Sequence, residues 1–482
     1  MNRKMVFSTV GRILLIEAAL LLLPIAVSLI YGEFGTTLSF LATASIAACL
    51  GLALSVFFRG HDRVIFAREG FVTVALAWIF MSAVGALPFV FSGAIPNYVD
   101  AFFETVSGFT TTGASILNNI EISSHGILFW RSFTHWIGGM GVLVFIMAIF
   151  PSESGRDIHI MRAEMPGPII GKLVPKVRDT AKLLYLIYVV MTAIQIVMLL
   201  FGGMPLFDSI VHTFGTAGTG GFGIRNDSIA SYSPYCQWVI TVFMLLFGLN
   251  FNLYYLLLIR RVRAVFKSRE LWCYLSIVAV SVTAICINIS RLYGSFSEAL
   301  RSSCFQVASI ITTTGYATAD FNAWPELSKT ILVVLMFIGG CAGSTAGGLK
   351  VSRIILLFKT VRRDLRHLIH PRSVETVQFE GKKIDDRTLS GVNSYLTVYC
   401  IIFFSVLLAL SALDSFDFTT NFTAVSACFN NVGPGLGAVG PTGNYYGYSA
   451  VSKLLLSVAM LLGRLEIFPL LLTLSPSTWM KK

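Results

Sequence analysis

Charged side chains are scarce in this sequence: Asp, Glu, Lys and Arg make up 13% of its 482 residues, whereas a soluble protein carries about 25%. Hydrophobic residues make up 55%, and the mean hydropathy is +0.75. A water-soluble fold of this length would leave much of that apolar surface facing water. The composition therefore excludes a soluble enzyme as the main body, and also a disordered or fibrous chain. We expect lipid to surround most of the protein.

The sequence also lacks the common motifs of catalysis and metal binding. Its eight cysteines include no CxxC pair, and its seven histidines include no HExxH. The cysteines lie mostly in or beside apolar stretches, which is typical of small buried hydrophobes rather than of disulfides or zinc ligands. The paired Asp or Ser/His set that an intramembrane enzyme would need is not visible in the apolar segments. We therefore expect no enzymatic activity, no transition metal and no organic cofactor in this chain.

Apolar runs long enough to cross a bilayer, which takes about 20 residues of helix, recur along the whole chain. The first run lacks a clear cleavage site and is followed closely by a second, so it is not a cleaved signal peptide. There are ten such runs: 13–31, 37–58, 69–91, 128–150, 183–203, 237–259, 271–290, 330–357, 394–413 and 450–474. They predict an all-α, multi-pass membrane protein.

Lys and Arg are distributed unevenly over the segments between these runs. The two termini and every second connection hold 29 of the 36 basic residues, and the other four connections hold 4. Because basic loops are retained on the cytoplasmic side, both termini and the basic loops are expected to face the cytoplasm, at a bacterial inner membrane. This pattern explains the net charge of +11 and leaves no need for a nucleic-acid partner.

The four outer connections resemble one another. Each is predicted to contain a short amphipathic helix followed by a glycine-containing turn, and each lies between two spans. They read NYVDAFFETVSGFTTTGAS (97–115), PLFDSIVHTFGTAGTGGFG (205–223), SSCFQVASIITTTGYAT (302–318) and TNFTAVSACFNNVGPG (420–435). An internal repeat of this kind decides the architecture: span, half-helix, loop, span, four times, preceded by two spans without such a loop.

Four equivalent loops inside a membrane indicate an ion pathway. Non-helical backbone at membrane depth must be buried in protein or line water, and rings of carbonyl oxygens can replace the water shell of a cation. Glycine allows the backbone to turn its carbonyls toward a common axis, and the negative end of each half-helix would point at the cation. The alternative is four glycine-rich extracellular turns, which does not explain the half-helix before each one.

Seven motifs in the chain are similar to those of the Trk/Ktr/HKT superfamily of potassium transporters, and within it to bacterial TrkH-type membrane subunits. They are SGFTTTGAS (107–115), RSFTHWIGGMG (131–141), TAGTGGF (216–222), GLNFNLYY (248–255), TTTGYAT (312–318), GGCAGSTAGGLK (339–350) and GRLEIFPLL (463–471). The resemblance implies four pseudo-symmetric membrane–pore–membrane repeats, like those of potassium channels, plus two extra N-terminal helices. It also implies a homodimer with a cytosolic nucleotide-binding regulatory subunit (TrkA-like). The corresponding division of the chain is an N-terminal helix pair at 1–60 and pore repeats at 61–155, 156–265, 266–390 and 391–482.

The resemblance also implies the residues of a potassium-selective filter. These are Thr111, Thr112, Gly113, Gly220, Gly221, Thr314, Gly315, Asn431, Val432 and Gly433. The reference glycine of the second loop is Gly221 rather than Gly220, because Phe222 then matches the Gly-Phe pattern of the family. The fourth loop departs most from the others, since Asn431 and Val432 stand where the first loop has threonines. We expect a filter that is not fourfold in its chemistry and that favours K⁺ over Na⁺ less sharply than a potassium channel does.

The eighth run is expected to break, because it contains five glycines in ten residues from Gly339 to Gly348, each costing about 1 kcal/mol in a helix. The break is either a small-residue packing surface or an intramembrane gate below the filter. The family resemblance favours the gate, formed by Gly343, Ser344, Thr345, Ala346, Gly347 and Gly348. Arg464 within the last run is either a pore-facing charge or an arginine that snorkels to the interface; the family favours a role in the gate.

Four other ionisable residues carry weaker signals. Glu104 and His212 occupy matching positions in two half-helices and are expected to support the filter rather than to relay protons. His135 is expected to be a hydrogen-bonded structural residue, and Asp320 to place a cation-attracting charge in the outer vestibule. The sequence thus predicts gated K⁺ uptake, with K⁺ as the transported substrate. The alternative is a proton- or sodium-coupled potassium symporter, although such proteins often use inverted repeats and midplane carboxylates.

Overall fold

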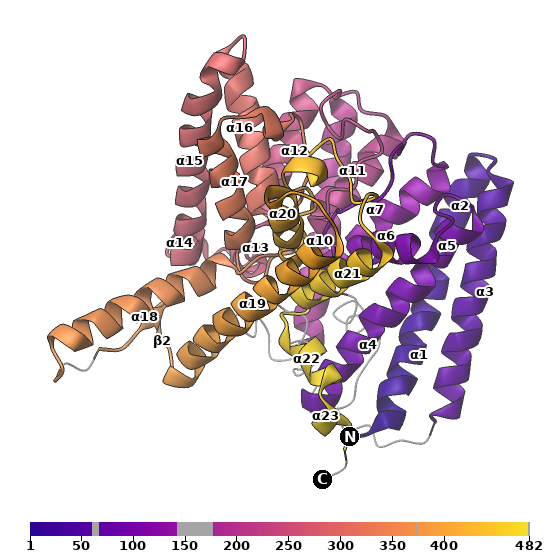
Figure 1. Cartoon of the computed structure of the whole chain (residues 1–482), viewed down its shortest axis with the longest axis horizontal. Coiled ribbons are helices and arrows are strands. Elements are labelled where there is room, and N and C mark those ends of the chain that lie inside the picture. Colours follow the sequence, from indigo (N-terminus) through magenta and orange to yellow (C-terminus); the bar gives the residue numbers. More distant parts are fainter. Residues whose placement is uncertain (60–66, 142–176, 373–374, 481–482) are drawn as a thin grey trace.

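The computed structural model describes residues 1–59, 67–141, 177–372 and 375–480 (Figure 1). Most of these residues are helical, which confirms the all-α prediction. The only strands among them are β1 (Gln378–Phe379) and β2 (Lys382–Lys383), which pair as a short antiparallel hairpin.

The N-terminal helices stand on one flank of the molecule. α1 (Arg3–Leu20) and α2 (Leu22–Ile30) form one apolar span, and α3 (Phe34–Phe57) returns beside it (Figure 1). The two spans meet closely at Gly11 and Gly51, where a Cβ on either glycine would lie 2.8 Å from the carbonyl oxygen of the other. Small residues permit this close approach of helix backbones in a membrane.

The rest of the described chain repeats one order of elements four times: a long first helix, a half-helix, and a second helix. The first helices are α4–α5 (Ala67–Gly85 and Leu87–Phe91), α10 (Val177–Phe201), α15 (Arg269–Ile289) and α19 (Asp386–Leu413). The half-helices are α6 (Tyr98–Phe109), α11 (Leu206–Gly218), α16 (Phe296–Ile311) and α20 (Phe418–Phe429). The second helices are α7 (His125–Gly139), α12 (Pro234–Phe247), α17 (Glu326–Ile338) and α21 (Ala450–Arg464).

Shorter elements join these units. They are the 3-10 turns η1 (Ser290–Leu292), η2 (Phe321–Ala323) and η3 (Gly437–Val439), and the helices α13 (Phe251–Leu258), α14 (Val262–Phe266), α18 (Val351–Ile369), α22 (Phe468–Leu474) and α23 (Pro476–Trp479). The expected boundaries after residues 60 and 155 lie outside the described residues. Those after 265 and 390 fall inside α14 and α19, so the third and fourth repeats begin structurally at α15 and α19.

The prediction of ten spans, broken only in the eighth, holds for the eighth run and is wrong for several of the others in one systematic way. Six helices or helix pairs of the described chain are long and apolar enough to cross a membrane alone. The second helices of the repeats are shorter, with 15, 14, 13 and 15 residues. The runs 237–259, 330–357 and 450–474 each divide into two helices, and α12 and α13 meet at 91°. The run 128–150 is described only to residue 141. Hydropathy adds up side-chain polarity and does not register these backbone breaks.

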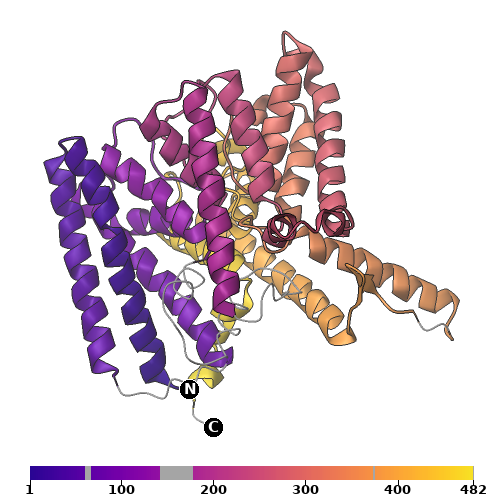
Figure 2. The ribbon, with the colours of Figure 1, turned by 180° about the vertical axis from the view of Figure 1, so that it is seen from behind.

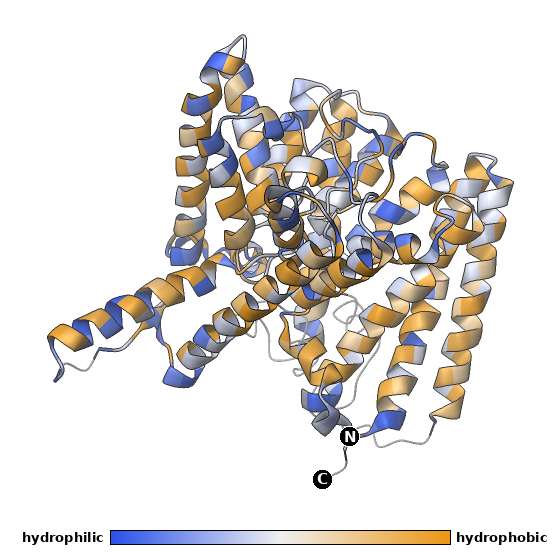
Figure 3. Cartoon of the chain, in the orientation of Figure 1, coloured by the Kyte–Doolittle hydropathy of each residue, from blue (hydrophilic) through white to orange (hydrophobic). Residues whose placement is uncertain are grey.

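The outer surface is apolar, as a bilayer requires. Side chains such as Phe57, Phe201 and Val280 are 83%, 84% and 69% exposed, and the outer faces of the upright helices are largely hydrophobic (Figure 3). α18 differs, because hydrophilic and hydrophobic residues alternate along it, and it projects from the body together with the start of α19 (Figures 1 and 3). In the view from behind, the short helices α13 and α14 lie at the foot of the upright helices, close to where α18 leaves the body (Figure 2).

Candidate functional site

The four half-helices end in the same hydrogen-bonded turn. In each loop, the residue before the reference glycine donates its N–H to the carbonyl five residues earlier. The pairs are Thr112 to Ser107 (2.9 Å), Gly220 to Gly215 (2.8 Å), Thr314 to Ser309 (2.8 Å) and Val432 to Ala427 (2.8 Å). The repeat seen in the sequence is therefore also a repeat of backbone geometry.

The backbone conformation identifies equivalent positions. The reference glycines Gly113, Gly221, Gly315 and Gly433 have φ values of 80°, 74°, 82° and 96°. Two residues before each of them, the left-handed conformation recurs in Thr111, Thr219, Thr313 and Asn431, with φ between 55° and 56°. Gly221 thus occupies the position of Gly113, and Gly220 occupies that of Thr112. Left-handed φ is uncommon for residues other than glycine, and its recurrence in four loops shows that the surrounding structure imposes it.

The loops close a ring in which each glycine touches the next loop. A Cβ on Gly113 would lie 2.0 Å from the carbonyl oxygen of Gly220, and one on Gly221 would lie 1.9 Å from that of Thr314. A Cβ on Gly315 would lie 2.1 Å from the carbonyl oxygen of Val432, and one on Gly433 would lie 2.6 Å from that of Thr112. No side chain fits at these contacts, so glycine is required at all four positions.

An outer cavity of about 130 Å³ opens onto this ring. All four reference glycines line it, together with Arg131, Arg225 and uncharged residues. Among the described residues, no acid lines the cavity. Asp320 does not line it, and its expected effect on the charge of the outer vestibule stays a prediction. Asp320 is exposed and its carboxylate accepts a hydrogen bond from the N–H of Asn322 at 3.0 Å.

Threonine hydroxyls occur at matching positions of the first and third loops, so the chemistry of the ring has twofold rather than fourfold symmetry. Thr110 and Thr112 approach to 2.8 Å through their Oγ1 atoms in the first loop, and Thr312 and Thr314 do the same in the third. The second loop has glycines at both corresponding positions, 218 and 220, and the fourth has Asn430 and Val432. Asn431 instead donates from Nδ2 to Thr112 Oγ1 at 2.9 Å.

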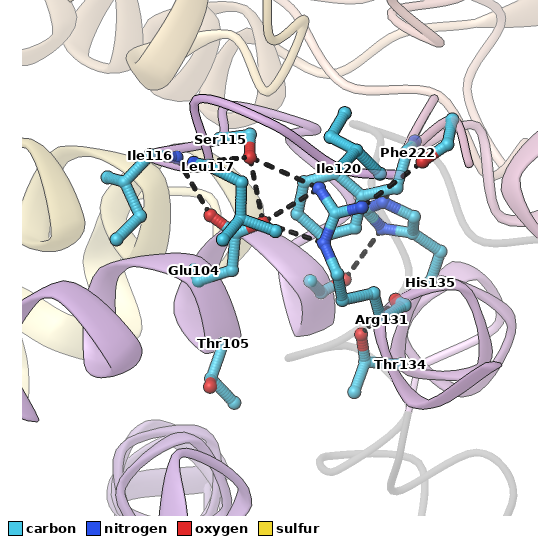
Figure 4. Close-up of polar contacts among 12 residues, drawn as sticks. Glu104, Thr105, Ser115, Ile116, Leu117, Ile120, Arg131, Thr134, His135 and Phe222 are labelled. Atoms are coloured by element: carbon cyan, nitrogen blue, oxygen red, sulfur yellow. Dashed lines mark hydrogen bonds and ion pairs between the residues drawn. The ribbon is translucent and has the colours of Figure 1, made fainter. Parts of the chain in front are cut away.

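A buried ion pair joins the first two loops (Figure 4). Arg131 of α7 donates from Nε to Glu104 of α6 at 2.8 Å, and both side chains are almost fully buried. Glu104 also accepts from Ile116 N at 2.9 Å, while Arg131 donates to Gly223 O at 3.1 Å and stacks 4.0 Å from the centre of the Phe222 ring. The prediction that Glu104 supports the loops agrees with these contacts. The sequence reading did not single out Arg131, because it lies 27 residues from Glu104.

Three neutral side chains fix the loops further. His135 donates from Nδ1 to Gly108 O at 2.8 Å and accepts from Phe222 N at 3.3 Å, which is the structural role expected for it. Tyr445 donates to Gly433 O at 2.8 Å, and Tyr316 donates to His212 O at 3.0 Å. The loops are therefore held from behind by side chains of other elements, as a rigid binding site requires.

The segment 339–350 joins α17 to α18 and doubles back on itself. It is called the gate segment hereafter, after the role that the family resemblance predicts for it. Leu349 N and Lys350 N donate to Phe337 O and Ile338 O, both at 3.0 Å. Its far end contacts the ring: Gly347 N donates to Thr313 Oγ1 at 2.6 Å, and Gly348 N donates to Asn430 O at 3.1 Å. A break in the predicted helix is thus observed, and it lies directly against the third and fourth loops.

The residues of the gate segment are largely buried and bonded. Ser344 Oγ donates to Cys341 O at 2.6 Å, Thr345 Oγ1 donates to Phe247 O at 3.3 Å, and the carbonyl of Ala346 accepts from Lys350 Nζ. Gly343 has a φ of 70°, as a turn inside the segment requires. α18 starts at Val351, directly after Lys350, as expected.

Arg464, the last residue of α21, binds the gate segment. Its guanidinium donates to Thr345 O at 2.8 Å, to Gly139 O at 2.8 Å and to Gly138 O. These carbonyl oxygens solvate the guanidinium charge within the protein, so the alternative that Arg464 snorkels to the membrane interface is wrong. Glu466 pairs with Arg353 of α18 and not with its neighbour Arg464. The sequence reading did not single out Glu270, a second buried residue at the gate segment; it accepts from Ala342 N at 2.7 Å.

The ligands that this site offers to a cation are backbone carbonyl oxygens and hydroxyl oxygens. No transition-metal chemistry is apparent at the site. Within the described ranges, no group of three or more His, Cys, Asp or Glu side chains could hold a metal ion. All eight cysteines are free. The apolar surface and the ring of four loops define the class: a multi-pass membrane protein in which four half-helices and their loops close a ring.

Within this class, the comparisons identify the family. The TrkH family model, described as a cation transport protein, matches residues 37–481. The Trk system potassium uptake protein TrkH of Salmonella typhimurium is 38% identical, over 99% of this chain and 100% of the relative. TrkG of Escherichia coli, another Trk system potassium uptake protein, is 33% identical over 95% and 94% of the two chains. The crystal structure of the potassium transporter TrkH from Vibrio parahaemolyticus matches with a TM-score of 0.89 and 32% identity over 100% of both chains. The chain belongs to the TrkH family of cation transport proteins, which is not an enzyme class.

Proposed function

We propose that this protein takes up K⁺ across a bacterial inner membrane through the ring of four loops, with both termini in the cytoplasm. The observation that carries the proposal is the closed ring, in which each reference glycine lies against a carbonyl of the next loop. Carbonyls at 112, 220, 314 and 432 hold equivalent places in the loops and, with the hydroxyls of the first and third loops, supply oxygen for a dehydrated cation. Relatives that match along their whole length are named potassium uptake proteins.

The gate segment is proposed to close this pathway from the inside. It contacts two of the four loops through Gly347 and Gly348, and Arg464 places a positive charge beside it. A cation passing this point meets both a steric and an electrostatic barrier, and the latter is several-fold stronger in a low-dielectric environment than in water.

The proposed assembly is a homodimer that binds a cytosolic nucleotide-binding subunit. The relatives are named as parts of a Trk system, and the cytoplasmic connections of this chain carry most of its Lys and Arg. The repeats proposed to form the pathway are those at 61–155, 156–265, 266–390 and 391–482, with the helix pair at 1–60 outside them.

The second candidate function is a proton- or sodium-coupled potassium symporter. It needs a carboxylate that takes part in ion exchange, whereas Glu104 is occupied by Arg131 and no acid lines the outer cavity. These contacts favour uncoupled flow through a gated pathway.

The test is ion flux through purified protein in liposomes, with K⁺ and Na⁺ compared in parallel. We expect K⁺ flux to exceed Na⁺ flux and to follow the K⁺ gradient alone. A requirement for a proton or sodium gradient would establish the symporter instead. Equal flux of both ions would contradict selectivity at the ring.

A further inference from the structure

The start of α15 is capped by a side chain from a distant cytoplasmic hairpin. Glu380 accepts through Oε1 from Glu270 N at 3.0 Å and from Ser268 Oγ at 3.2 Å. The first N–H groups of a helix lack partners within the helix, and its positive end favours a carboxylate. The hairpin of β1 and β2 therefore fixes the first turn of α15 although it lies 110 residues further along the chain.

The conformation of Glu380 is unusual for its residue type. Glu380 and Gly381 form the two-residue turn between β1 and β2, with φ values of 49° and 74°. Turns with two positive φ values prefer Asn, Asp or Gly at the first position. A glutamate held in this conformation costs conformational energy, which the contacts of its carboxylate with α15 offset.

The residue whose N–H is capped also holds the gate segment. Glu270 is 4% exposed and accepts through Oε1 from Ala342 N at 2.7 Å. The residues on either side of Ala342 are bonded to the break between α12 and α13: Cys341 N donates to Gly248 O, and Phe251 N donates to Gly343 O, both at 3.0 Å. The gate segment is thus held between the start of α15 and the α12–α13 break.

The same hairpin also packs on the helix that leaves the gate segment. Lys359 of α18 donates from Nζ to Gln378 O at 2.6 Å. Leu356 of α18 belongs to a buried cluster with residues of the hairpin and of α19, namely Val377, Phe379, Ile384, Leu389 and Val392. Figure 1 shows β2 between α18 and α19. Moving the hairpin therefore changes contacts both with α15, which holds the middle of the gate segment, and with α18, which continues from its end.

We propose that Glu270 is a positioning residue of the gate segment, and that Glu380 of the hairpin keeps it in place by capping the first turn of α15. The proposal rests on the proposed function in taking residues 339–350 as the gate. When Glu380 leaves α15, the first N–H groups of that helix lose their partner. The first turn of α15 would then loosen, and Glu270 would release Ala342.

Cys341 provides a direct reporter, because it lies in the gate segment and is fully buried. In a variant that keeps Cys341 as its single cysteine, the rate of modification by a membrane-impermeant thiol reagent measures exposure of the segment. We expect Glu380→Ala, which removes a helix cap, and Glu270→Ala, which removes the acceptor of the Ala342 N–H, each to raise this rate about fivefold or more. Glu270→Gln keeps an acceptor for Ala342 and should stay near the parent rate. Glu375→Ala is the matched control, since Glu375 is an exposed acid on the same connection that pairs with Arg366.

K⁺ flux in liposomes, measured on the same variants and normalised to folded protein, separates the two proposals. Faster modification with higher flux supports both. Faster modification with unchanged flux supports the positioning role and overturns the assignment of 339–350 as the gate. Unchanged modification in both alanine variants overturns the inference. If Glu380→Ala yields too little folded protein, Ser268→Ala replaces the N-cap residue of α15, whose Oγ donates to Glu380 and accepts from Leu271 N. An unchanged rate in that variant and in Glu270→Ala would count equally against the inference.

Discussion

At the scale of single residues, the site depends on two kinds of position. The first kind has no room for any side chain, and the second kind has a buried side chain that must keep its hydrogen-bonding partner. The four reference glycines are of the first kind, because a carbonyl of the next loop occupies the space of a Cβ. Glu104, Arg131 and Glu270 are of the second kind, because each is buried and bonded to backbone of a loop or of the gate segment.

Gly113→Ser tests the ring. The added Cβ would lie 2.0 Å from Gly220 O at a φ of 80°, so the first two loops must separate. We expect weaker discrimination of K⁺ from Na⁺ or loss of flux, measured in liposomes and as growth of a transport-deficient host at low potassium. Gly93→Ser is the matched control, because Gly93 has a φ of 75° but open space around its Cβ position. Unchanged flux ratios after substitution at both Gly113 and Gly315 would remove the basis of the filter assignment.

Glu104→Ala tests the buried ion pair. It leaves the Arg131 guanidinium buried without its carboxylate, which costs about 3–5 kcal/mol, so the thermal midpoint of the purified protein should fall steeply. Arg366→Ala breaks an exposed pair with Glu375 and should change stability by no more than about 1 kcal/mol. Equal midpoints for the two variants would show that the Glu104–Arg131 pair does not stabilise the loops.

At the scale of elements, sequence reasoning located the half-helices and their glycines because a Gly/Thr pattern repeats four times. It missed the 91° bend between α12 and α13. Gly248 followed by Asn250 is a recognisable signal that one helix ends and another begins. Asn250 caps α13 by accepting from Asn252 N at 3.0 Å. The break after Arg464 has a weaker signal in the sequence. The residues with left-handed backbone there are Glu466 and Ile467 rather than glycines, and only Pro469 in the first turn of α22 marks a new helix. Contacts between distant elements, such as Glu104 with Arg131 or Glu380 with α15, leave no periodic trace in a single sequence.

The gate segment and Arg464 should restrict flux through different physical effects. Deleting residues 343–348 removes a steric barrier, and Arg464→Ala removes a positive charge bound to Thr345 O. Both changes should raise basal K⁺ flux without the cytosolic partner and leave the preference for K⁺ unchanged, because neither alters the four loops proposed to select the ion. Flux must be normalised to folded dimer. Normal flux per dimer with reduced yield in Arg464→Ala would instead make Arg464 a structural residue.

At the scale of the whole molecule, the distribution of charge complements the distribution of apolar surface. The upright helices consist mostly of hydrophobic residues (Figure 3), many of which are exposed, while the basic residues concentrate on one set of connections. α18 carries Lys359, Arg362, Arg363, Arg366 and Arg372 in and just beyond its length, and it projects from the body. A basic surface of this kind favours an acidic partner or one that carries a bound nucleotide.

This arrangement predicts that nucleotide acts on the chain only through a second protein. A pull-down from native membranes should recover a nucleotide-binding subunit, and its retention should weaken as salt rises from about 0.1 M to 1 M, since the Debye length falls from about 10 Å to 3 Å. Neutralising Arg362 and Arg372, both exposed, should weaken retention of the subunit. The control is Arg225→Gln on an outer connection, which removes one positive charge without touching the cytoplasmic face. Flux through the purified chain alone should not respond to ATP, ADP or NAD. A full nucleotide response of the chain by itself would show that the regulatory site lies within it, and the cytosolic partner would then not be needed to explain control of the gate.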